Sequence, residues 1–152
     1  MRRCFLTGCY SGLLPKAPGT WGTLFGALLA WVILLFLPQS TLFYLVILTT
    51  IIAIKEIDKF EQQTGIHDDP SIVIDEIAGI WLAISILPST NPIWIALAFF
   101  FFRFFDIKKP SYIGKLDKLP GGFGVMADDL LAGVLAGLCA GVIYVAFMHY
   151  VV

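Results

Sequence analysis

Five apolar segments, each bounded by proline, glycine or charged residues, take up most of this chain and limit the folds open to it. They cover residues 21–37, 41–54, 72–87, 92–105 and 130–151. A helix needs about 20 apolar residues to cross a bilayer, so all but the last must use flanking residues or a locally thinned bilayer. Because 59% of the residues are hydrophobic and only 14% are charged, the sequence predicts one all-α domain over residues 1–152, a polytopic membrane bundle of about five short transmembrane helices.

The charged residues fall on one side of this predicted bundle. The turns at 38–40 and 88–91 carry no charge, whereas Arg2 and Arg3 lie at the N-terminus. The positive-inside rule therefore places the N-terminus and the charged ends of the helices in the cytoplasm. A formal net charge of −1 gives no basis for binding nucleic acid, and no protein partner is evident. We expect the protein to act at the cytoplasmic face of the membrane.

Two pairs of carboxylates interrupt the apolar segments. Asp75 and Glu76 are expected about one turn into the third helix, and Asp128 and Asp129 open the fifth. An ionised carboxylate at the centre of a bilayer costs about 2.5–3.5 kcal/mol, and adjacent carboxylates also repel each other, so a cation is expected beside them. An ion pair of the first pair with Arg103, and helix capping by the second pair, are the structural alternatives.

Basic residues and glycines are predicted at the same depth as these acids. Arg103 lies three residues before Asp106 and is followed by Lys108, while Lys16 and Thr20 lie just before the first helix. Carboxylates suit Mg²⁺, and Arg or Lys suits phosphate oxygens. The glycines of residues 121–124 are expected to form a loop whose backbone N–H groups cradle a phosphate. The pattern indicates a magnesium-assisted phosphate site.

Small residues at a spacing of four predict which helix faces meet. Such stripes allow close approach of helix backbones in lipid. The predicted stripes consist of Asp129, Gly133, Gly137 and Gly141 in the fifth helix, of Asp75, Gly79 and Ala83 in the third, and of Gly22, Gly26 and Ala30 in the first. Because a carboxylate begins two of these stripes, we expect both acids to point into the bundle.

Four stretches of the chain together resemble the phosphatidylglycerophosphatase A family of bacterial lipid phosphatases. They are LPKAPGTWGTL at 14–24, IVIDEIAGIW at 72–81, FRFFDIKKP at 102–110 and GGFGVMADDLLAG at 121–133. The resemblance implies a Mg²⁺-dependent phosphatase of the bacterial cytoplasmic (inner) membrane. Its substrate would be a membrane phospholipid, phosphatidylglycerophosphate, which loses its terminal phosphate to give phosphatidylglycerol.

The resemblance also assigns residues to this chemistry. The acidic motif positions of the family fall on Asp75, Glu76, Asp128 and Asp129, and its basic and N-terminal positions fall on Arg103, Lys108, Lys16 and Thr20. We expect Glu76 and Asp129, with Asp75 or Asp128, to hold Mg²⁺. Arg103, Lys108 and Lys16 would bind the phosphate, and a remaining carboxylate would be the base for an attacking water. Asp69 and Asp106 are further candidates.

Two other functions also fit helices with buried carboxylates. A small transporter or carrier would need polar residues through the depth of the membrane, and the outer half of this predicted bundle has almost none. A purely structural membrane subunit is the other alternative. It would stay folded and unchanged in function when Asp75 or Asp129 is neutralised.

Overall fold

Seven α-helices and one 3-10 helix make up the part of the chain that this computed structural model describes, residues 2–67, 69–110 and 112–151, with no β-strand among them. They are α1 (Arg2–Leu6), η1 (Ser11–Leu13), α2 (Pro18–Phe36), α3 (Ser40–Thr64), α4 (Ile74–Ser85), α5 (Pro92–Lys108), α6 (Ile113–Leu116) and α7 (Gly121–Val151). The five predicted apolar segments correspond to α2, α3, α4, α5 and α7. The all-α prediction is confirmed.

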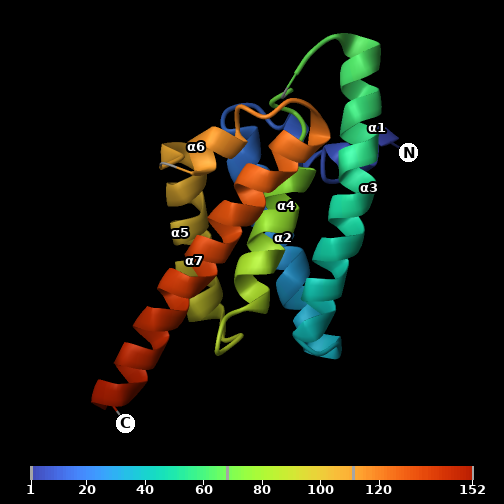
Figure 1. Ribbon diagram of the computed structural model, residues 1–152. Helices are drawn as coiled ribbons and strands as arrows, with labels where there is room; N and C mark the ends of the chain where they lie inside the picture. The colour runs from blue at the N-terminus through green and yellow to red at the C-terminus, as the bar shows by residue number, and fades with distance from the viewer. Residues whose placement is uncertain (1, 68, 111, 152) are drawn as a thin grey trace.

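The two ends of the bundle differ in character. Figure 1 shows the N-terminus, α1 and α6 at one end of the bundle. The C-terminus lies at the other end, as do the turns that join α2 to α3 and α4 to α5. Those two turns are the uncharged stretches 38–40 and 88–91. The end with α1 and α6 is called the polar end below, because the charged residues of the chain gather there.

Three of the described helices are long and apolar enough to cross a membrane: Pro18–Phe36, Ser40–Thr64 and Gly121–Tyr150. Helices α4 and α5 have 12 and 17 residues, or about 18 and 26 Å at 1.5 Å per residue, against a hydrocarbon core of about 30 Å. The structure therefore supports an all-α membrane protein. Five spans and a cytoplasmic N-terminus remain predictions.

Helix α4 lies at the centre of the bundle and contacts α2, α3, α5 and α7. The predicted stripes of small residues form these contacts. A Cβ added at Gly79 would lie 2.7 Å from the carbonyl oxygen of Asp129, and one at Gly133 would overlap the carbonyl oxygen of Gly79. On the other face, a Cβ at Gly26 would lie 3.1 Å from Cα of Ile77. The expectation that these faces meet is confirmed.

Helix α7 begins nine residues before the predicted segment at 130, and this early start corrects two predictions. Gly121 to Gly124 lie in the first turns of the helix, so they do not form the predicted phosphate-binding loop. Asp128 and Asp129 lie about two turns inside α7 and do not cap it. Instead, Oδ1 of Asp58 on α3 accepts a hydrogen bond of 2.7 Å from the backbone N–H of Gly122.

Asp58 is therefore expected to stabilise the start of α7 as an N-cap supplied by another helix. Replacing Asp58 with alanine should lower the free energy of unfolding by about 1 kcal/mol, the usual cost of losing a side-chain cap. Thermal unfolding in detergent measures this. Asp58→Asn keeps an oxygen acceptor and should be nearly neutral, so equal losses in both variants would contradict the capping role.

Candidate active site

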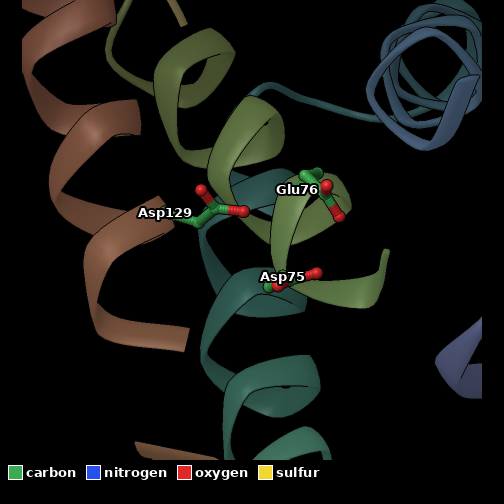
Figure 2. A group of neighbouring side chains, drawn as sticks. All are labelled: Asp75, Glu76 and Asp129. Atoms are coloured by element: carbon green, nitrogen blue, oxygen red, sulfur yellow. The ribbon is translucent and has the colours of Figure 1, made fainter. Parts of the chain in front are cut away.

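Three carboxylates from two helices converge at the polar end of the bundle. Asp75 and Glu76 lie in the first turn of α4, and Asp129 reaches toward them from α7 (Figure 2). One carboxylate oxygen from each residue lies within 4.8 Å of the other two. Because α4 begins at Ile74, two residues after the start of the predicted segment, Asp75 and Glu76 lie in its first turn and not about one turn into it. The first turn also suits these acids, because the N-terminal end of a helix carries partial positive charge.

These carboxylates line a cavity of about 290 Å³ at the polar end. Six acidic side chains border it, namely Asp75, Glu76, Asp106, Asp117, Asp128 and Asp129, together with two basic ones, Arg103 and Lys109. The lining thus has a formal excess of four negative charges. Asp75, Asp128 and Asp129 are each less than 9% exposed, and buried carboxylates in such number need a compensating cation.

Some oxygens in this cavity have no partner within the described residues. Oδ1 of Asp75, Oε2 of Glu76 and Oδ1 of Asp128 are buried without a hydrogen bond to any described group. Native proteins rarely leave buried polar atoms in this state, unless an ion or water occupies the site. Oxygens on opposite sides of Mg²⁺ lie about 4.2 Å apart, twice the Mg–O distance. Adjacent ligands lie closer still, at about 3 Å, so the three oxygens, which lie within 4.8 Å of one another, would have to draw together around an ion. Their donor set suits a divalent cation.

Gly19, in the first turn of α2, allows α2 to approach the acids that α4 and α7 carry. A Cβ at this position would clash with Oε1 of Glu76 and would lie 3.2 Å from Nη1 of Arg103. The preceding residue, Pro18, favours the start of a helix at this point because its ring fixes φ near the helical value. The backbone of α2 is therefore part of the cavity wall, and only glycine leaves room for the carboxylate and the guanidinium.

Arg103 connects α5 to α2 beside the acids. Its Nη1 donates to Oδ2 of Asp106 one turn later and, at 3.3 Å, to Oγ1 of Thr23 on α2. The pairing with Asp106 that the sequence suggests is thus present, and no ion pair between Arg103 and Asp75 or Glu76 occurs among the described residues. Nε of Arg103 is buried and has no described partner. The guanidinium therefore lies at the cavity wall, next to the acids, with one buried N–H that no described residue accepts.

Lys109 is the second cation of the cavity, and sequence reasoning chose its neighbour Lys108 instead. Nζ of Lys109 donates to Asp128 at 2.7 Å and also to Asp117. Burial lowers the pKa of Lys109, but the hydrogen bonds to Asp117 and Asp128 outweigh burial and hold its pKa above the ordinary value, so the ammonium stays charged. The chain turns sharply here because Lys109 adopts a left-handed conformation with φ 41°.

One sequence signal could have identified Lys109. Proline disfavours a helical conformation in the residue before it, so Pro110 indicates that α5 ends at Lys108 and that Lys109 faces a different direction. No comparable signal marks Asp117, which lies at the C-terminal end of the short helix α6. Only the fold of the segment between α5 and α7 brings Asp117 to the cavity.

Four predicted residues do not line the cavity. The side chains of Lys16 and Lys108 are exposed, and Thr20 is half-buried next to the cavity residues of α2. Oδ1 of Asp69 accepts hydrogen bonds from the backbone N–H and the hydroxyl of Ser71, at 2.8 and 2.6 Å. Asp69 therefore has a local role in the turn before α4, and Asp106 lines the cavity as the partner of Arg103.

Known proteins resemble this chain over most of its length. It is 41% identical over 130 residues to phosphatidylglycerophosphatase A of Haemophilus influenzae, covering 85% of this chain and 80% of the relative. The corresponding protein of Escherichia coli is 37% identical over 144 residues, 94% of this chain and 81% of the relative. A putative phosphatidylinositol-3-phosphatase of Bacteroides thetaiotaomicron is 42% identical over 137 residues, 84% of each chain. No solved structure matches.

The family profile agrees with these relatives and with the cavity. The profile described as phosphatidylglycerophosphatase A matches residues 4–144, a range that includes all eight charged residues of the cavity lining. The family resemblance seen in the four sequence stretches is thus confirmed over nearly the whole chain, and this protein belongs to the phosphatidylglycerophosphatase A family.

Proposed function

We propose that this protein is a Mg²⁺-dependent phosphatase that converts phosphatidylglycerophosphate to phosphatidylglycerol and phosphate at the cytoplasmic face of the bacterial inner membrane. The observation that carries the proposal is the group of Asp75, Glu76 and Asp129, whose oxygens lie within 4.8 Å of one another beside Arg103 and Lys109 in one cavity. A metal-binding group of acids next to two phosphate-binding cations suits hydrolysis of a phosphate ester.

The position of the site supports a lipid substrate. The cavity lies at the polar end of the bundle, whereas large apolar side chains of α2, α3 and α5, such as Phe36, Tyr44 and Phe100, are exposed along its length. A phospholipid presents its phosphate at the membrane surface and keeps its acyl chains in the hydrocarbon. A transporter is less well supported, because the charged side chains collect at one end and do not continue through the bundle.

Each group of the cavity has a proposed role in the reaction. Asp75, Glu76 and Asp129 would hold Mg²⁺, which supplies positive charge that stabilises the charge developing on the phosphoryl oxygens. Arg103 and Lys109 would bind and orient the phosphate group. Asp128, with Oδ1 unpartnered among the described residues, would take the proton of a water that attacks phosphorus. The bond from phosphorus to the glycerol oxygen then breaks, and that oxygen takes up the proton that Asp128 received from the water.

The two neighbouring lysines provide a matched test of phosphate binding. Lys109→Met should lower kcat/KM by about 10²-fold, because a hydrogen bond to a charged group contributes about 1.5–3 kcal/mol. Lys108→Met should change kcat/KM by less than about threefold, since the side chain of Lys108 is exposed and outside the cavity lining. Steady-state phosphate release from micelles measures both. A larger loss in Lys108→Met would favour the original assignment from the sequence.

Release of phosphate by detergent-purified protein tests the proposed function. Phosphatidylglycerophosphate should be hydrolysed in Mg²⁺, hydrolysis should stop with a chelator, and added Mg²⁺ should restore it. A phosphatidylinositol 3-phosphate arm is included because one relative bears the name of a phosphatase for that lipid. Faster hydrolysis of the inositol lipid would contradict the proposed substrate, and activity unaffected by chelator would contradict the proposed metal dependence.

A further inference from the structure

A second cavity, of about 370 Å³, lies between α2 and α5. All eight of its lining residues are apolar, and they include Leu24, Leu28 and Trp31 on α2 and Ala96 and Phe99 on α5. The side chains of Leu28 and Trp31 are about half exposed, so the cavity is an open groove on the side of the bundle. Nothing in the proposed chemistry uses it.

Both walls of this groove continue into the carboxylate cavity. On α5, Ala96, Phe99 and Arg103 are spaced three and four residues apart and so share one face of the helix. On α2, a spacing of four leads from Ala27, which lines the groove, through Thr23 to Gly19, which lines the carboxylate cavity. Phe99 and Arg103 are about one helical turn apart, or about 6 Å along the axis. The apolar groove and the polar cavity are therefore consecutive along the same two helices.

Arg103 marks the boundary between them. Its guanidinium lies with Asp106 in the polar cavity and donates to Oγ1 of Thr23 across the gap between α2 and α5. Thr23 is fully buried, and its hydroxyl donates to the carbonyl oxygen of Gly19 at 2.7 Å. On the side of the Arg103–Thr23 hydrogen bond away from the carboxylate cavity, the groove between α2 and α5 is lined by apolar side chains. A lipid whose phosphate meets Arg103 would find an apolar channel directly below its headgroup.

We propose that the groove between α2 and α5 holds one acyl chain of the lipid whose phosphate occupies the carboxylate cavity. This inference rests on the proposed function and adds a binding site for the apolar part of the substrate. Lipid tails are as apolar as the groove, so the chain gains no hydrophobic transfer energy by entering it. The groove instead aligns the lipid, and this alignment brings the phosphate to Arg103 and Lys109.

Filling the groove should therefore separate lipid substrates from soluble ones. Ala96→Trp places a large apolar side chain at an exposed position of α5 that lines the groove. It should lower kcat/KM for long-chain phosphatidylglycerophosphate by about 10- to 100-fold, since misplacing a substrate by 1 Å can cost about 10²-fold. It should leave kcat/KM for the deacylated headgroup, glycerophosphoglycerophosphate, within about twofold. Ala146→Trp, in another lipid-facing groove on α7, is the matched control and should change neither value.

A photoreactive lipid gives a readout that does not depend on turnover. A phosphonate analogue of the substrate with a diazirine in one acyl chain should form adducts on Leu28, Trp31 or Phe99, and excess phosphatidylglycerophosphate should suppress them. Phosphatidylcholine with the same diazirine should label these residues several-fold less. Ala96→Trp should abolish the adducts. Adducts confined to the groove between α6 and α7, at Leu131 and Leu135, would overturn the proposal.

The outcomes distinguish the groove from the proposed function. If wild-type protein hydrolyses the lipid but Ala96→Trp lowers activity on both substrates equally, or on neither, the groove proposal is wrong and the proposed function stands. If wild-type protein releases phosphate from neither substrate, the proposed function fails, and the groove proposal fails with it.

Discussion

Replacing Asp129 with asparagine is expected to lower kcat for phosphate release on the order of 10³-fold. Asp129 is the one residue of the three-acid group that comes from α7, and its side chain is 3% exposed. Asparagine has nearly the same shape but no negative charge, so the two remaining acids on α4 would hold a cation far less well. Removing one charged or polar group from a preorganised site commonly costs 10²–10³-fold, and weaker metal binding adds to that loss.

Although activity should fall, the stability of the Asp129→Asn protein should not. Without a metal ion, Asp129 adds negative charge to a buried group that already contains Asp75 and Glu76, so its neutralisation should leave the melting temperature in chelator unchanged or higher. Asp69→Asn is the control, because Asp69 is not among the described residues that line the cavity, and its side chain accepts hydrogen bonds from Ser71. A folded Asp129→Asn protein with wild-type activity would contradict the assignment.

The Gly19→Ala protein is expected to lose about 10²-fold in kcat/KM while remaining folded. The added methyl group would clash with Oε1 of Glu76 and press on Nη1 of Arg103, and a displacement of about 1 Å in a catalytic group can cost that much. Gly19 does not require a left-handed conformation, and alanine favours helix formation over glycine by about 1 kcal/mol. Loss of activity would therefore report the clash and not an unfolded helix.

A second glycine supplies the matched control for this change. A Cβ at Gly141 would lie 3.5 Å from Cδ of Pro88, an ordinary van der Waals contact. Pro88 belongs to the turn between α4 and α5, which lies at the end of the bundle opposite the polar end (Figure 1). Gly141→Ala should therefore keep full activity. Phosphate-release kinetics measure the activity of both variants, and far-UV circular dichroism shows whether their helices are folded. Wild-type activity in Gly19→Ala would show that α2 does not approach the acids as closely as the structure places it.

The sequence predicted the convergence of the acids because the relevant pattern is periodic. Gly79 and Gly133 fall on the same stripes as Asp75 and Asp129, so a helical repeat is enough to predict that the two stripes meet and that their acids point inward. The structure confirms the close approach of Gly79 to α7. The start of α5 at Pro92 was also predicted, whereas α2 begins at Pro18, three residues before the predicted segment, although proline favours the first turn of a helix.

Other parts of the site depend on contacts between distant segments and leave no periodic signal. The early start of α7 depends on Asp58 of α3, 64 residues away from Gly122. Lys109 is an exception, because Pro110 marks the end of α5 locally, but the position of Asp117 depends on the short helix α6. The crowding at Gly19 likewise depends on Glu76 from another helix. Local sequence reasoning has no means to rank such neighbours.

Binding of Mn²⁺, used as a paramagnetic substitute for Mg²⁺, tests the central claim most directly, because it asks whether acids from α4 and α7 share one ion. Electron paramagnetic resonance of detergent-purified protein measures the free and bound metal. Wild-type protein should bind Mn²⁺ in competition with Mg²⁺, and Glu76→Gln and Asp129→Asn should each weaken binding by at least about tenfold, while Asp69→Asn should not. Equal Mn²⁺ affinity in wild type, Glu76→Gln and Asp129→Asn would contradict a shared metal site between the two helices.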